Sequence, residues 1–93
     1  MKPQYEPKDE QQHLGYLIEE AGEVQAAAGK TLRWGLNSYN PELPEEQRET
    51  NADWLWREME DLNAALGRMA AWLRENDYPS PYDIERGGIG YKP

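Results

Sequence analysis

The chain has 93 residues, enough for one domain whose small core leaves a lone chain marginally stable. With 18 acidic and 10 basic side chains its net charge is −8, which argues against nucleic acid or an anionic membrane as partner and permits a cation site built from carboxylates. It has no cysteine and one histidine, which excludes disulfides, thiolate zinc sites and histidine-rich metal centres, and without a leader or spanning segment we expect a cytoplasmic protein.

The first predicted elements are an arm and a long helix. Residues 1–8 contain two prolines and form the arm. From Asp9, a candidate N-cap, to Trp34 there is no proline, and Gly35 is a typical helix stop. Apolar residues recur at helical spacings of three and four. This apolar stripe consists of Leu14, Leu17, Ile18, Ala21, Val24, Ala28, Thr31 and Leu32.

A second helix follows a connection at residues 35–50, which carries Pro41 and Pro44. It is predicted from about Asn51 to Asn76, before Pro79, and residues 79–93 form a tail. Residues 9–78 therefore read as one helical hairpin. The second apolar stripe consists of Leu55, Met59, Leu62, Leu66, Met69 and Leu73.

The fold class that these elements predict is all-α. Two long amphipathic helices would lie antiparallel within each chain. A lone hairpin cannot bury both of its faces, so we expect a four-helix arrangement formed on oligomerisation, as a homodimer or homotetramer.

Two pairs of carboxylates mark the candidate site. Glu20 and Glu23 are three residues apart on the first helix, and Glu58 and Asp61 are three apart on the second, so each pair projects from one side. Glu58 lies inside the apolar stripe, where an unpaired charge is costly. If the helices pack through these faces, four carboxylates converge. Their repulsion would be relieved by one or two divalent cations, Mg²⁺ or Mn²⁺, typical of a polyphosphate site.

Nearby side chains suit a phosphorylated ligand. Lys30 lies on the strip of Glu20 and Glu23, and Arg33 is in the same last turn. Both are candidate phosphate contacts, although ordinary charges at a helix C-terminus are the competing interpretation. Trp34 and Trp54 are candidates for stacking on a base, with core or dimer packing as the alternative. His13 is interpreted as an ordinary helix residue.

The two motifs together resemble a known family. Glu19-Glu20-x-x-Glu23 followed by Glu58-x-x-Asp61 is similar to the EExxE…ExxD signature of the MazG-like, all-α nucleoside triphosphate pyrophosphohydrolases. The context LIEEAGEVQAAAGKTLRWG looks particularly like short phage and bacterial members, and the resemblance covers residues 14–73.

The resemblance implies Mg²⁺-dependent hydrolysis of nucleoside triphosphates, with dNTPs or damaged nucleotides as expected substrates, to the monophosphate and pyrophosphate. By position, it makes Glu20, Glu23, Glu58 and Asp61 the metal ligands. Glu19 would activate the water or lie in the outer shell, and Lys30 would contact phosphate.

The interval between Glu23 and Glu58 is longer than is usual in the family, which the 35–50 connection would explain as a longer loop. The chain also ends soon after the second helix, so we expect a neighbouring chain, with its 79–93 tail as a candidate, to complete the nucleotide pocket.

Three alternatives to this function can be compared with the sequence. The first is a non-enzymatic acidic helical dimer, acting as a protein-interaction or nucleic-acid-mimic module. A di-iron bundle would need Glu-x-x-His pairs, which the single histidine cannot supply. A relative that acts on phosphoribosyl-ATP would share the site chemistry and differ in the base pocket.

Overall fold

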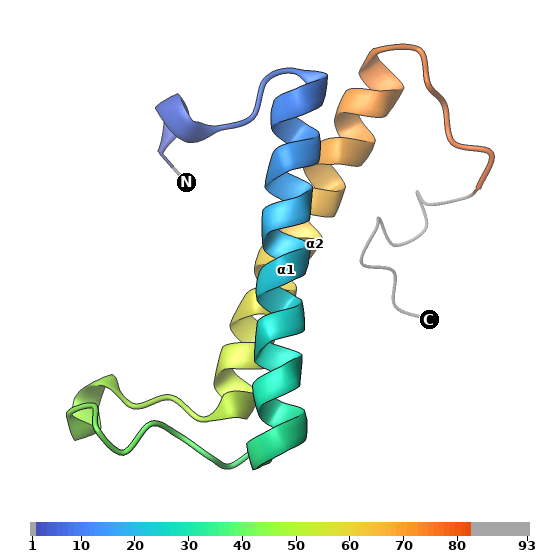
Figure 1. The fold of residues 1–93 in the computed structure, drawn as a ribbon. Helices are drawn as coiled ribbons and strands as arrows, with labels where there is room; N and C mark the ends of the chain where they lie inside the picture. The colour runs from blue at the N-terminus through green and yellow to red at the C-terminus, as the bar shows by residue number, and fades with distance from the viewer. Residues whose placement is uncertain (1, 83–93) are drawn as a thin grey trace.

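The computed structural model describes residues 2–82, and most of the expected 79–93 tail lies outside them. Two helices of 25 residues, α1 (Glu10–Trp34) and α2 (Asn51–Glu75), run antiparallel and side by side (Figure 1). Short 3-10 turns occur at Pro3–Tyr5 and Glu45–Gln47, and residues 2–82 contain no strand. The all-α class is therefore confirmed, with two α-helices within the described residues.

The bounds of α1 follow from its capping residues. The side chain of Asp9 accepts a hydrogen bond from the backbone N–H of Gln12 at 2.8 Å, which satisfies one free donor of the first turn. At the other end Gly35 has φ of 93°, a conformation that glycine adopts without a Cβ clash, and its N–H donates to the carbonyl of Thr31.

Similar capping interactions mark the two ends of α2. The hydroxyl of Thr50 accepts from the N–H of Asp53 at 3.2 Å. After the last turn Asp77 adopts φ of 69°, and the N–H of Tyr78 donates to the carbonyl of Leu73 at 2.8 Å. This is the hydrogen-bond pattern of a Schellman motif, with aspartate at the position that glycine usually takes.

The two helices meet through a face that coincides only in part with the predicted stripes: Met69 of the second stripe is buried, whereas Ile18 and Leu32 of the first stripe are exposed. The most buried apolar residues are small or unbranched: Ala27, Ala65, Met69 and Ala70. His13 is also buried, and its ring lies 6.5 Å from that of Trp72. Alanines at the contact let the backbones approach closely, so the hairpin closes on a narrow seam.

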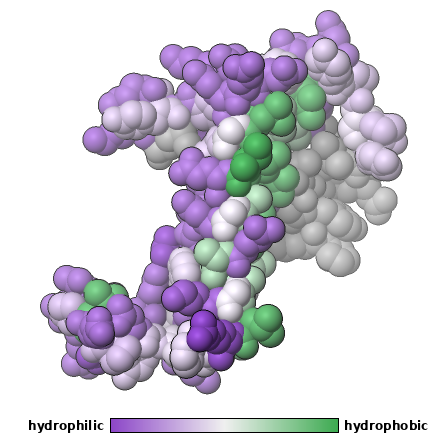
Figure 2. All heavy atoms as spheres, viewed as in Figure 1, coloured by the Kyte–Doolittle hydropathy of each residue, from purple (hydrophilic) through white to green (hydrophobic). Residues whose placement is uncertain are grey.

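Larger apolar side chains remain on the outer surface. Ile18 is 71% exposed and Leu32 is 90% exposed, and with Leu14 they recur along one side of α1. Figure 2 shows hydrophobic side chains gathered along part of the face of α1 seen in that view, with hydrophilic ones beside them. Within residues 2–82, neither helix combines the length and apolar character needed to cross a membrane.

Candidate metal centre

Three carboxylates from the two helices gather at the middle of the seam. Glu20, Glu23 and Asp61 each offer one oxygen, and these three oxygens lie within 4.8 Å of one another. The i,i+3 spacing aims Glu20 and Glu23 at the same region, and the antiparallel packing of α2 brings Asp61 opposite them.

Glu58 lies beside this cluster and is 3% exposed. One of its oxygens accepts a hydrogen bond from the guanidinium of Arg57 at 2.8 Å, and Arg57 also binds Glu49 at 2.7 Å. The Glu23 carboxyl lies near that of Glu58 and contributes to the rise of its pKa. Glu58 therefore belongs to the same group of carboxylates, although the three oxygens that lie within 4.8 Å of one another come from Glu20, Glu23 and Asp61.

Burial and mutual repulsion raise the pKa of two of these groups. The pKa of Glu20 rises from 4.5 to about 7, first because the carboxyl is removed from water and then because the charges of Glu23 and Asp61 lie close by. Burial likewise raises the pKa of Glu58, and Glu23 and Asp61 reinforce that rise while Arg57 opposes it. Near neutral pH the cluster therefore favours a bound proton or another cation.

A divalent cation fits this arrangement. One oxygen of Glu20 is buried and has no hydrogen-bond partner within the described part of the chain. The donor set is entirely oxygen, as Mg²⁺ and Mn²⁺ prefer. Side-chain rotations that bring the three oxygens closer together would let Glu20, Glu23 and Asp61 hold one such ion.

The remaining predicted polar residues occupy more open positions. Glu19 is exposed, on the turn that carries Glu20. Lys30 is exposed near the end of α1, and the guanidinium of Arg33 lies 5.0 Å from the ring centre of Trp34. The cation next to the carboxylates is instead Arg57, which lies 2.8 Å from Glu58.

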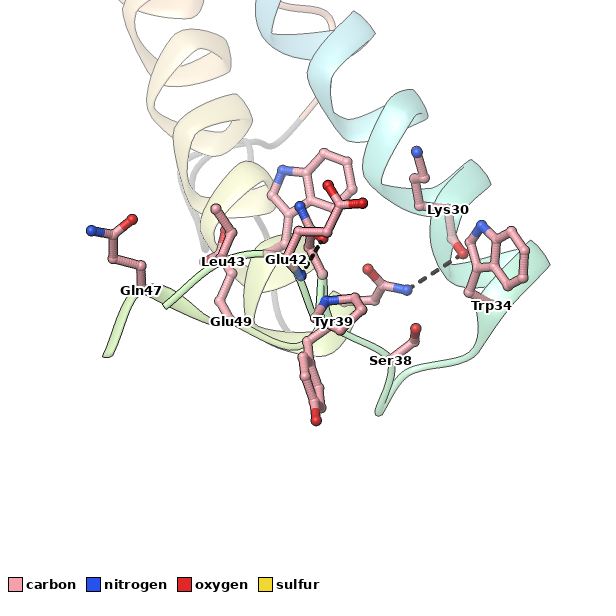
Figure 3. Close-up of a pocket in the computed structure, with 12 residues that line it drawn as sticks. Lys30, Trp34, Ser38, Tyr39, Glu42, Leu43, Gln47 and Glu49 are labelled. Carbon is pink, nitrogen blue, oxygen red and sulfur yellow. Dashed lines mark hydrogen bonds between the residues drawn. The ribbon is translucent and has the colours of Figure 1, made fainter. Parts of the chain in front are cut away.

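Two hollows open beside the cluster. The smaller, of about 290 Å³, is lined by Glu23, Ala26, Trp54, Arg57 and Glu58. The larger, of about 610 Å³, lies between the end of α1, the connection and the start of α2 (Figure 3), and Lys30, Trp34 and Trp54 contribute to its wall. Trp54 lines both, so the two hollows adjoin. Three of the four predicted substrate-binding residues, Lys30, Trp34 and Trp54, thus line the larger hollow. The fourth, Arg33, lies against the ring of Trp34.

Sequence reasoning missed the residues that the connection contributes. Tyr39, Leu43 and Glu49 line the larger hollow, yet residues 35–50 show no periodicity that indicates which side chains face inward. The abundance of tyrosine and tryptophan was the available signal, and it does not specify position.

Comparisons of the chain with protein families, with characterised proteins and with solved structures find no match.

Proposed function

We propose that this protein is a Mg²⁺- or Mn²⁺-dependent nucleoside triphosphate pyrophosphohydrolase. The observation that carries the proposal is the convergence of Glu20, Glu23 and Asp61 across the helical seam, with a buried oxygen of Glu20 that has no hydrogen-bond partner among residues 2–82. The EExxE…ExxD resemblance supports the same reading, as do the aromatic hollow and the cations close by.

In the proposed reaction a water oxygen attacks a phosphorus atom of the nucleotide, and the bond to the pyrophosphate group breaks. A divalent cation supplies charge neutralisation of the phosphate oxygens and a more acidic bound water. Glu20, Glu23 and Asp61 hold that cation. Glu58 would join them in its ionised form, since carboxylates bind metals as anions.

Residues at the edge of the seam handle the proton and the phosphate chain. Glu19, exposed next to Glu20, accepts the proton of the attacking water. Arg57 and Lys30 contact phosphate oxygens, because each lines one of the two hollows. Their positive charge offsets the charge that develops as the phosphorus–oxygen bond breaks.

The active form is proposed to be a homodimer or homotetramer with a four-helix arrangement. The support is the outer surface of α1, where Leu14, Ile18 and Leu32 are exposed on one side. Exposed apolar stripes of this kind are usual at helix–helix interfaces between chains. A second hairpin would cover this stripe.

The rival interpretation is an acidic interaction module, which predicts that the motif carboxylates face solvent. Glu19, Glu23 and Asp61 are exposed, as the rival predicts, but Glu58 is buried and Glu20 is partly buried, which favours the metal site.

The test is pyrophosphate release from a panel of dNTPs and NTPs, with Mg²⁺ and with EDTA. Glu58→Gln is compared with Glu60→Gln, which removes one charge from an exposed position on the same helix. We expect EDTA and Glu58→Gln each to reduce turnover by at least about 100-fold, the scale of losing a group that organises a metal site, while Glu60→Gln keeps wild-type activity. Full activity in Glu58→Gln would sink the assignment.

A further inference from the structure

Arg57 connects two carboxylates at the edge of the helical seam. Its Nη1 donates to Glu58 at 2.8 Å, and its Nη2 donates at 2.7 Å to Glu49, which precedes α2. The two contacts use different nitrogens, so the planar guanidinium makes both at once. Arg57 is therefore held against Glu58 by an ion pair on its other side.

Glu58 is the residue that needs this contact. It is buried, and the charges of Glu23 and Asp61 lie close to its carboxyl. A buried carboxylate requires a compensating positive charge, and within the described chain Arg57 supplies one. Arg57 and Glu49 are both exposed, so water would solvate either of them without a partner. The burial of Glu58 explains why the guanidinium reaches into the seam.

The guanidinium lies where a metal ion would approach Glu58. The smaller hollow, of about 290 Å³, has Arg57 and Glu58 in its wall together with Glu23 of the carboxylate cluster. A divalent cation shared by Glu23 and Glu58 would lie next to the guanidinium. Positive charges that share one carboxylate repel each other strongly where little water screens them. Arg57 and the cation therefore compete for Glu58.

We infer that Arg57 is an internal counter-ion of the metal centre, which occupies Glu58 in the metal-free protein and gives it up when a divalent cation binds. Because Arg57 is exposed, its flexible side chain can turn from Glu58 towards the phosphate chain. This inference rests on the proposed function for the identity of the cation and of the phosphate. It makes Arg57 a positioning residue that acts on the metal through Glu58.

The exchange has opposite consequences for metal binding and for turnover. The favourable free energy of metal binding is partly offset by the loss of the pair between Arg57 and Glu58. Removing the guanidinium should therefore tighten metal binding, while turnover falls because a contact for phosphate is lost. A residue that only orients Glu58 would be required for both, so its removal would weaken both.

The first experiment measures binding of Mg²⁺ and of Mn²⁺ alone to the whole protein by calorimetry at pH 8. Arg57→Gln is compared with wild type and with Arg74→Gln, which removes the same charge from the exposed last turn of α2. We expect Arg57→Gln to bind each metal at least about tenfold more tightly, the scale of one hydrogen bond to a charged group that no longer has to be broken. Arg74→Gln should match wild type. Equal or weaker binding in Arg57→Gln overturns the inference.

The second experiment follows the guanidinium itself in the wild-type protein by nitrogen-15 NMR. The side-chain N–H signals of Arg57 should shift or broaden when Mg²⁺ is added, because the contact with Glu58 is lost. Those of Arg48, which donates to the carbonyls of Leu43 and Pro41 in the connection, should stay unchanged and serve as the internal reference. Metal binding with unchanged Arg57 signals overturns the inference, whatever the folding of the variants.

The two experiments separate this inference from the proposed function. Metal binding that displaces Arg57 without hydrolysis of any nucleotide supports the counter-ion and removes the proposed reaction. Hydrolysis without displacement of Arg57 does the reverse. Metal binding by Arg57→Gln but not by wild type supports the inference, and no metal binding by either protein overturns both proposals.

Discussion

The inner and outer faces of the helical hairpin invert the usual distribution of polarity. At the inner seam Glu58 is 3% exposed, and Glu20 has a buried oxygen that finds no hydrogen-bond partner in the described part of the chain. On the outer side Ile18 and Leu32 are 71% and 90% exposed. A monomer selected only for stability would place these groups the other way round, because buried charge and exposed apolar surface both cost free energy.

The inversion is explained if each face has a partner. A cation in the seam would compensate the carboxylates, and a second hairpin would cover the apolar stripe. The two faces thus differ in what completes them, a ligand on one side and a copy of the chain on the other. Three predictions test this difference, and they are ordered by the size of the expected effect.

The outer face is tested with Ile18→Glu, which places a charge in the middle of the exposed stripe. If a second hairpin covers Ile18, the buried charge should weaken association by at least about 100-fold, or about 2.7 kcal/mol. Sedimentation across a range of concentrations measures this. Ala64→Glu adds the same charge at an exposed position of α2 and should leave the oligomer intact. A wild-type protein that stays monomeric at all concentrations would contradict the prediction.

The inner face is tested by the pH dependence of stability without metal. Folding raises the pKa of Glu20 from 4.5 to about 7, so the protonated carboxyl stabilises the fold below pH 4.5, and this stabilisation is lost as the pH rises through about 7. Because Glu20 is only partly buried, we expect a loss of about 1–2 kcal/mol after allowing for solvent screening.

Thermal melts of wild type and Glu20→Gln in EDTA at pH 5 and pH 8 measure this loss as the difference between the two proteins. Glu20→Gln cannot ionise, so its advantage over wild type should grow with pH, and Mg²⁺ should stabilise only the wild type. The same difference at both pH values would show that Glu20 titrates normally. Glu60→Gln is the matched control.

The smallest effect is expected at a residue outside both faces. Asp9→Ala removes the 2.8 Å hydrogen bond to the N–H of Gln12 and should lower the free energy of unfolding by about 1 kcal/mol. Denaturant titration measures it. The loss should be the same at pH 5 and pH 8 and with or without Mg²⁺, which distinguishes general destabilisation from effects on the seam. Dependence on Mg²⁺ would connect this cap to the site.

Local sequence signals were sufficient to predict where the two helices begin and end. The Asp9 cap, the Gly35 stop and the apolar periodicity predicted α1 within one residue, and α2 was predicted equally closely from its stripe and from the stop before Pro79. These signals depend on hydrogen bonds and steric limits within a few residues, so they can be read from the sequence. They also showed that Glu20 and Glu23, like Glu58 and Asp61, project as pairs.

Tertiary structure decided which faces meet. The predicted seam ran through the large apolar stripes; Met69 of the second stripe is buried there, but the hairpin also closes on Ala27 and Ala65 and leaves Ile18 outside. It also decided that Arg57 lies beside Glu58 and that Tyr39 lines a hollow. Helix rotation and the path of the connection depend on contacts between distant residues, and periodicity within one helix carries no information about them. The sequence by itself determined two helices and their carboxylate pairs, and only packing determined the site that they form.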